Sequence, residues 1–382
     1  MWVQLFILIC ALWGLNLYPE IGNEIQRKYA RKKYIIFMMV LFCLQSGLRH
    51  IAVGPDTFAY YQMFNEIRAM SWNSLIDMFI RFIENDEGKD PGYKILQYLF
   101  AVVIPSYRFF LIAIAVFFFT AMGNFLYKYT NSNKEVLVAI ALYQCLYYSF
   151  MSITGLRQTI ATGFLLFAIP YIIEKKWTTA FILFLLAVSQ HKSALLFAGF
   201  VILPMIKKPR WLLLFTFIAF IPMFKFGGKI ASFLMSGTRF EQYSMYLEGF
   251  EGAGAYSFTA FILLLGICLF IKSKQMTNAN SYGYIFINAI AISILLTPLT
   301  MIDPSNMRIV QYYSIFALIT LPQFITILSK KYPLNIHIII FIILGIYTVF
   351  GLQYEYGFFW QDMSLGSNYG LNIKFNEFDL NK

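Results

Sequence analysis

The stretch RFFLIAIAVFFFTAMGNFLY, residues 108 to 127, carries no charged side chain after its first residue. A helix needs about 20 apolar residues to cross the hydrocarbon core of a bilayer, so this stretch predicts a transmembrane helix. Apolar residues make up 59% of the 382 residues and charged residues only 13%, which excludes an ordinary water-soluble domain. Similar runs, some of them shorter, recur at 1–18, 34–48, 135–152, 157–173, 178–190, 192–206, 211–225, 257–271, 282–300, 308–329 and 333–352. The sequence therefore predicts an all-α polytopic membrane protein with about twelve transmembrane helices.

The charges between the runs predict the orientation. We interpret the short run 92–104 as a re-entrant or interfacial helix, because counting it as a crossing would invert every later loop. The inner breaks then hold 16 Lys and Arg against four Asp and Glu, a net charge of +12, and the outer side holds 14 against 15, a net charge of −1. Loops rich in Lys and Arg face the cytoplasm. Both termini are therefore expected outside, and the excess positive charge does not indicate nucleic acid.

The long segments between the runs all fall on the outer side. We expect one transmembrane domain over residues 1–352, with outer loops at 49–107 and 226–256, and an outward-facing tail at 353–382. Within the first loop, WNSLIDMFIRFIE at residues 72 to 84 has apolar residues at helical spacing and predicts a helix that lies along the membrane surface. Function on a rigid scaffold is concentrated in such loops, so we expect the chemistry at the outer face.

Three arginines lie at the outer ends of predicted helices. The preference of Lys and Arg for cytoplasmic loops, which explains the inner cations, does not explain these three. They are Arg49 in QSGLRH, Arg157 in SITGLRQTIA and Arg308 in DPSNMRIVQYY. The arginine guanidinium can form bidentate hydrogen bonds with phosphate oxygens, and it keeps its charge under partial burial. The set therefore indicates a phosphorylated ligand, and the alternative is that each side chain reaches separately to lipid headgroups.

Polar residues in two outer turns are candidates for the chemistry. His191 and Lys192 lie in VSQHKSALLF, where a histidine could deprotonate a hydroxyl or bind phosphate, or could simply be hydrogen-bonded at a helix junction. Asp56 follows Gly54 and Pro55 and could cap the next helix, accept a proton from a sugar hydroxyl, or fix Arg49.

Aromatic residues near the outer boundary have two interpretations. Tyr60 shares a helical face with Asp56, and Tyr312 lies near the same boundary; such rings can stack on sugars or form a membrane belt. The three histidines are far apart in sequence, no outer loop holds a DxD pair, and the acids of ENDEGKD, residues 84 to 90, resemble a solvated turn. We therefore predict no metal site.

Four motifs in order give a family resemblance. GLRHIAVGPDTFAYYQMF at 47–64, GLRQTIA at 155–161, QHKSALLF at 190–197 and NMRIVQYY at 306–313 resemble the EpsG family of bacterial Wzy-like polysaccharide polymerases. The resemblance implies a GT-C-like helical membrane glycosyltransferase whose donor is a glycan on undecaprenyl diphosphate. It implies His191 or Asp56 as the base, and substrate binding by Arg49, Arg157, Gln158, Lys192, Arg308, Tyr60 and Tyr312.

The expected function is polymerisation of an exopolysaccharide, capsule or O-antigen. The enzyme would transfer the glycan to a hydroxyl of another lipid-linked repeat unit, at the outer face of the bacterial cytoplasmic (inner) membrane, without a cofactor or a metal. The alternatives are a lipid-linked glycan flippase and a membrane acyltransferase that modifies a surface glycan. The sequence leaves open whether a flippase or a chain-length regulator binds the inner loops.

A shared cavity is the geometric expectation. Ionisable groups within membrane domains usually face an internal cavity rather than lipid. Arg49, Arg157, His191 and Arg308 are therefore expected to line one outward-open cavity, roofed by residues 56–107 and open laterally to the outer leaflet.

Overall fold

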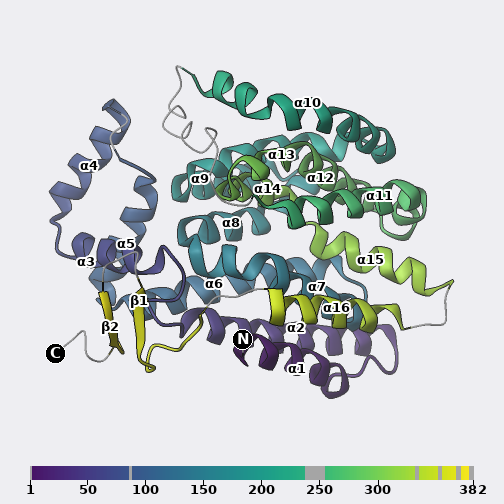
Figure 1. Cartoon of the computed structure of the whole chain (residues 1–382), viewed down its shortest axis with the longest axis horizontal. Coiled ribbons are helices and arrows are strands. Elements are labelled where there is room, and N and C mark those ends of the chain that lie inside the picture. The colour runs from purple at the N-terminus through teal and green to yellow at the C-terminus, as the bar shows by residue number, and fades with distance from the viewer. Residues whose placement is uncertain are drawn as a thin grey trace. The chain divides into compact units, whose positions relative to one another are not determined.

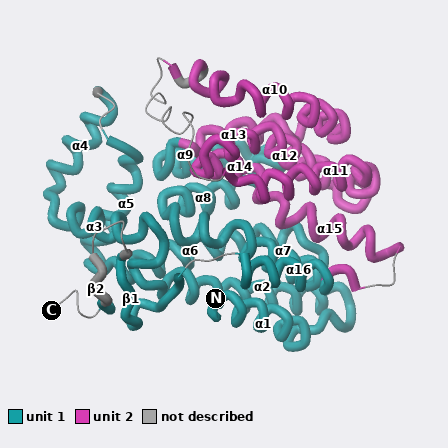
Figure 2. The backbone as a smooth tube through the Cα atoms, viewed as in Figure 1, with its two compact units in different colours: residues 1–192, 338–382 teal, residues 193–337 magenta. Residues whose placement is uncertain are grey.

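The computed structural model describes residues 2–85, 88–236, 254–331, 335–351, 355–366 and 371–377. Of the expected outer loop 226–256, residues 226–235 belong to a helix and residues 237–253 lie outside the described residues. The chain divides into two compact units, residues 1–192 with 338–382, and residues 193–337 (Figure 2). The prediction of a single domain over 1–352 stays a prediction, and the described parts of the expected tail belong to the first unit.

In its described residues, the first unit contains consecutive helices from α1 to α9, one late helix and a small hairpin, whose arrangement Figure 1 shows. Its helices are α1 (Trp2–Leu17), α2 (Glu24–Gly47), α3 (Thr57–Arg68), α4 (Trp72–Asn85), α5 (Pro91–Val103), α6 (Tyr107–Tyr129), α7 (Asn133–Leu142), the π-helix η1 (Tyr143–Thr154), α8 (Leu156–Ile173), α9 (Trp177–Gln190) and, except for its first two residues, α16 (Ile336–Gly351). The strands β1 (Met363–Gly366) and β2 (Leu371–Phe375) pair antiparallel.

The elements formed by the described residues of the second unit are all helices. It contains the 3₁₀-helix η2 (Lys192–Met205, from its second residue), α10 (Pro209–Met235), α11 (Tyr256–Ala279), α12 (Gly283–Leu296), α13 (Pro298–Ile302), η4 (Pro304–Asn306), α14 (Met307–Ser314) and α15 (Ala317–Ser329).

Local sequence explains where several helices begin. Asn23 caps α2, because its side chain accepts a hydrogen bond from Gln26 N at 2.9 Å while the Gln26 side chain accepts one from Asn23 N, also at 2.9 Å. This reciprocal capping box satisfies two backbone donors. Pro91 opens α5, where the N–H that proline lacks would be unpaired in any case.

Six helical stretches within the described residues are long and apolar enough to cross a membrane. They are Tyr107–Tyr129, Asn133–Thr154, Leu156–Ile173, Pro209–Phe233, Tyr256–Ala279 and Gly283–Ile302. A seventh arises if Pro304–Ser314 and Ala317–Ser329, which meet at a bend of 58°, form one crossing. The all-α membrane class is confirmed, whereas the count of about twelve and the GT-C-like fold stay predictions.

Of the other predicted crossings, 34–48 lies, except for its last residue, within the 24-residue α2, whereas α1, α9, η2 and α16 are shorter apolar helices of 14 to 16 residues. The 3₁₀-helix η2 shows how a short run could still span. Its 14 residues form a 3₁₀-helix, which rises about 2.0 Å per residue and so extends about 28 Å. An α-helix of this length would extend only about 21 Å. The hydrocarbon core is about 30 Å thick, so the tighter winding makes this short run nearly long enough. At 13 residues, α5 is too short to span, as the re-entrant or interfacial interpretation of 92–104 requires.

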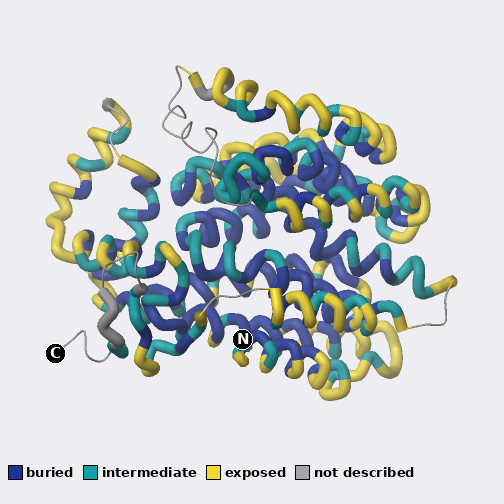
Figure 3. Tube along the Cα trace, viewed as in Figure 1, coloured by how far each residue is buried: buried dark blue, intermediate teal, exposed yellow. Residues whose placement is uncertain are grey.

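The helix predicted over residues 72–84 is present as α4. In the first unit, α6 and α8 are largely buried, whereas α4 exposes most of its surface (Figure 3). Its exposed residues include large apolar side chains such as Phe79 and Ile83. Exposed apolar side chains at helical spacing are expected of a helix at a lipid surface.

The C-terminal segment packs against the end of α2. His50 N donates to Gly357 O at 2.8 Å, and Phe359 N donates to Leu48 O at 3.0 Å. The Glu377 carboxylate pairs with Arg108 and accepts a hydrogen bond from Ile51 N at 3.0 Å. These contacts attach the described residues of the C-terminal segment, 355–366 and 371–377, to the chain that leads from α2 into α3.

Candidate functional site

Asp90 lies directly before Pro91, at the start of α5, and is buried with 1% of its surface exposed. Its backbone is left-handed, with φ 47°, a conformation in which Asp is enriched among residues other than glycine. The charges around Asp90 in the sequence do not indicate this burial, and the interpretation of ENDEGKD as a solvated turn is wrong at its last residue. The only local signal was an aspartate immediately before a proline that opens a helix.

The Asp90 carboxylate joins side chains from two distant helices. Oδ2 accepts a hydrogen bond from Arg157 Nη1 at 2.8 Å and lies 3.0 Å from His191 Nδ1. Oδ1 accepts a hydrogen bond from Lys192 N at 3.1 Å. Arg157 is in the first turn of α8, and His191 directly follows α9. Three of the predicted site residues, Arg157, His191 and Lys192, therefore meet at a carboxylate that was not among the predicted site residues.

A close approach of α5 and α9 places these groups. A Cβ atom added to Gly92 would lie 2.5 Å from Ser189 O, closer than any side chain could fit, so glycine is needed where the two backbones meet. Just beyond this point α9 ends, and His191 turns to an extended conformation, with its N donating to Ala187 O at 3.1 Å. The imidazole can then reach Asp90.

The charges around Asp90 keep it ionised. Burial alone would raise the pKa of Asp90, but the hydrogen bond from His191 and the charges of His191 and Arg157 outweigh it and hold the pKa below its ordinary value. An ionised carboxylate only accepts hydrogen bonds, so His191 must carry a proton on Nδ1. In the neutral ring, the lone pair is then on Nε2.

Arg157 remains partly accessible despite its ion pair. Its side chain is 21% exposed, against 8% for His191. Its Nε donates to the Tyr60 hydroxyl at 3.4 Å, and its Cζ lies 5.7 Å from the centre of the Tyr60 ring. The guanidinium is thus held by a carboxylate and an aromatic residue. With Lys192 adjacent, the site combines a base with two cations.

Arg49 has a different environment. It is fully buried, and Nη1 donates to Ser46 O and, at 3.3 Å, to Ser46 Oγ. Within the described part of the chain, its Nε and Nη2 have no hydrogen-bond partner. Its charge is near the hydroxyls of Tyr107, Tyr148 and Tyr356. A role for Arg49 in binding the diphosphate stays a prediction, and it would require this burial to be relieved.

The remaining predicted residues are distributed over both units. Asp56 occupies the N-cap position of α3, but its side chain makes no capping hydrogen bond, so the capping interpretation is wrong. Gln158 is buried on α8. Arg308 and Tyr312 belong to α14 in the second unit, where the Tyr312 hydroxyl lies 3.0 Å from Ser193 Oγ. One cavity shared with Arg308 stays a prediction.

The described residues contain no candidate metal site. No group of three or more His, Cys, Asp and Glu side chains in that part of the chain could hold a metal ion.

Comparison with known proteins gives one result. No curated protein and no solved structure matches the chain. The model of the EpsG family matches residues 32–362, a range that includes α5, α8 and α9 and the whole Asp90 network. The chain therefore belongs to the EpsG family, membrane proteins of polysaccharide biosynthesis.

Proposed function

We propose that the chain is a polysaccharide polymerase. It would transfer a glycan from undecaprenyl diphosphate to a hydroxyl of another lipid-linked repeat unit, at the outer face of the bacterial cytoplasmic membrane. The observation that carries the proposal is the buried carboxylate of Asp90, which binds both Arg157 and His191. Family membership supports a role in polysaccharide biosynthesis, and this network supplies groups suited to glycosyl transfer.

His191 is the proposed general base. Asp90 fixes the ring so that Nε2 can accept the proton of the acceptor hydroxyl as its oxygen attacks C1 of the donor sugar. A bond forms between that oxygen and C1, the bond from C1 to the phosphate oxygen breaks, and the proton stays on His191. The Asp90 carboxylate stabilises the resulting imidazolium, and a positioned base of this kind contributes about 10²- to 10⁴-fold in rate. Asp56 is the alternative base.

Arg157 and Lys192 are proposed to stabilise the departing diphosphate. With Asp90 ionised and His191 neutral, these two cations leave the site with one net positive charge, and protonation of His191 adds another as the negative leaving group forms. Positive groups already in place where charge develops are an effective source of catalysis. The proposed reaction needs no divalent metal, so polymer should still form in excess chelator. Loss of activity under chelation, restored by magnesium or manganese, would disprove this part of the proposal.

The direct test is polymer synthesis by purified protein in vesicles supplied with lipid-linked repeat units. His191→Gln should lower the rate at least 100-fold, as removal of a general base requires, while donor binding persists. His337→Gln is the control, because His337 is the second unit's histidine and bonds to Thr326 at 3.0 Å. A fall of less than tenfold in the rate of polymer synthesis by His191→Gln would refute the role of His191 as the general base.

The same vesicles discriminate the alternative functions. A flippase would move labelled lipid-linked glycan across the bilayer without forming a glycosidic bond, and an acyltransferase would need an acyl donor. In a cysteine-free background, a cysteine at position 192 should react with an impermeant reagent added outside cells. Labelling only from inside would contradict the proposed orientation and favour the acyltransferase.

A further inference from the structure

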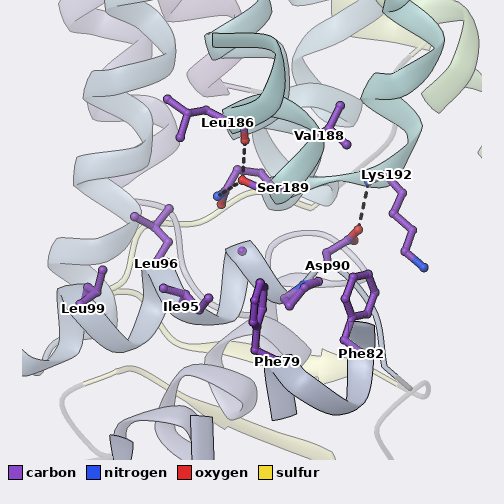
Figure 4. Close-up of a pocket in the computed structure, with 13 residues that line it drawn as sticks. Phe79, Phe82, Asp90, Ile95, Leu96, Leu99, Leu186, Val188, Ser189 and Lys192 are labelled. Atoms are coloured by element: carbon purple, nitrogen blue, oxygen red, sulfur yellow. Dashed lines mark hydrogen bonds between the residues drawn. The ribbon is translucent and has the colours of Figure 1, made fainter. Parts of the chain in front are cut away.

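A groove of about 500 Å³ lies among α4, α5 and α9 (Figure 4). This size is within the range of about 300–1,000 Å³ usual for ligand sites. Apolar side chains from all three helices line it, including Phe79, Phe82, Ile95, Leu96, Leu99 and Leu186. Several of these are partly exposed, Leu99 by 52%. The groove therefore offers apolar surface for a ligand to cover.

The ionic groups of the groove are at one end. Asp90 and Lys192 are the charged residues that line it, and Lys192 Nζ lies 4.7 Å from the centre of the Phe82 ring. From Asp90 the groove follows α5 past Ile95 to Leu99, about 14 Å along the helix at about 1.5 Å per residue. Leu99 lies at the end away from Lys192 (Figure 4). The groove thus has a charged head and an apolar body.

We propose that this groove holds the isoprenoid chain of a polyprenyl diphosphate, with the diphosphate against Lys192 and Arg157. The inference rests on the proposed function, because it locates the lipid carrier of that reaction. Two features select this occupant: an unbranched apolar track along α5, and at its head the cation Lys192, with Arg157 paired to Asp90 behind it, both of which complement phosphate oxygens. Because Asp90 also bonds Arg157 and His191, a diphosphate at the head would lie beside the proposed base.

The packing of α5 against α9 gives the groove a fixed wall. Gly92 and Ser189 both line it, and the Gly92 backbone approaches Ser189 O so closely that no Cβ fits between them. The wall is therefore backbone against backbone, whereas α4 contributes the rings of Phe79 and Phe82. A long chain can enter such an open groove along its length, without passing through the protein.

Photo-crosslinking tests the location independently of transfer. The probe is undecaprenyl diphosphate with a diazirine in the isoprenoid chain, added to protein in vesicles without acceptor. We expect adducts on groove residues of α4, α5 and α9, competed by unlabelled undecaprenyl diphosphate and not by phosphatidylglycerol. Adducts only elsewhere, or equal competition by phosphatidylglycerol, would overturn the proposal. Specific labelling of a protein that makes no polymer would leave the groove in place and refute the polymerase.

Two variants test the body and the head of the groove separately. Leu99→Trp should lower affinity for undecaprenyl diphosphate relative to a ten-carbon prenyl diphosphate at least tenfold, because only the longer chain reaches position 99. Its control is Leu185→Trp, at a similarly exposed leucine (49%) of α9 that does not line the groove. Lys192→Gln should weaken binding of the diphosphate at least tenfold more than that of the free polyprenol, with Lys94→Gln as its control. Equal effects in variant and control would refute the assignment.

Discussion

Replacing Asp90 with asparagine removes one negative charge and almost no volume, and it should disable the candidate site. The carboxylate accepts three hydrogen bonds, from Arg157, His191 and the backbone of Lys192. An amide has one oxygen and one NH₂ group. If its oxygen faces Arg157 and His191, its NH₂ group faces the N–H of Lys192; if it is flipped, the NH₂ group faces the other two donors. Either orientation leaves at least one donor unpaired.

The size of the effect follows from these contacts. A buried donor left unpaired costs about 1–3 kcal/mol, and breaking a buried ion pair costs about 3–5 kcal/mol. Because Arg157 is 21% exposed, water screens part of its charge, and we expect a loss of about 2–4 kcal/mol in the free energy of unfolding. The rate of transfer should fall at least 100-fold, since the base loses its fixed orientation.

Polymer synthesis and thermal unfolding of the detergent-solubilised protein should be measured together. Asp77→Asn is the matched control, because Asp77 is an exposed aspartate of α4, and it should change neither quantity. If Asp90→Asn unfolds earlier but keeps more than a third of the activity, Asp90 is structural and the proposed mechanism fails. If neither quantity changes, the network contributes nothing measurable.

The pH dependence separates an electrostatic role from a structural one. The pKa of Asp90 is held below its ordinary value, so its contribution to stability is present above the unfolded value of about 3.9 and is lost as pH falls through the folded value. Well above the unfolded value Asp90 itself stays ionised, so its own titration no longer changes the free energy of unfolding. Without the carboxylate, His191 is harder to protonate, so the acid limb of the residual activity should move to lower pH. An unmoved acid limb would contradict His191 as the titrating base.

Three further outcomes are expected. Arg157→Lys keeps the charge but cannot hold Asp90 and Tyr60 together, so the amount of polymer should fall at least tenfold at a normal protein level. Arg68→Lys, at an exposed arginine, is the control and should behave as wild type. Normal polymer length in both variants would favour binding of Arg157 to lipid headgroups. Glu377→Gln leaves the largely buried Arg108 charge without its partner, so the C-terminal segment should become accessible to limited proteolysis. Glu355→Gln, at an exposed glutamate, is the control and should not have this effect. Equal digestion of the two variants would show that the Arg108–Glu377 pair does not hold the segment. Burial lowers the pKa of His50 to about 4, so between about pH 6.5 and pH 4 the unfolded chain binds more protons than the folded chain. Attachment of the C-terminal segment should therefore weaken as pH falls through this window. Protection of the segment from proteolysis that does not change with pH would contradict this prediction.

The class of protein and much of its local structure could be predicted from the sequence. Apolar runs and the breaks between them predict helices because burial in lipid requires every backbone group to be bonded within the segment. The helix over 72–84 could be predicted for a similar reason, since its apolar residues repeat at the helical period. Arg157 and His191 were recognisable because a charged or titratable residue at the end of an apolar run has a high desolvation cost.

Which of these residues meet depends on the tertiary structure. Asp90 lies among other charged residues in sequence, and its position before Pro91 does not by itself indicate burial, since the preceding residue Lys89 is exposed. Asp90 is buried where α5 approaches α9 at Gly92. Arg49 has the same sequence context as Arg157 but is enclosed near Tyr148 and Tyr356. Desolvation and ion pairing depend on neighbours in space, which for Asp90 are 67 and 101 residues away in the chain. Periodicity and composition report only on neighbours along the chain, so they could propose the base and a cation but not the carboxylate that joins them.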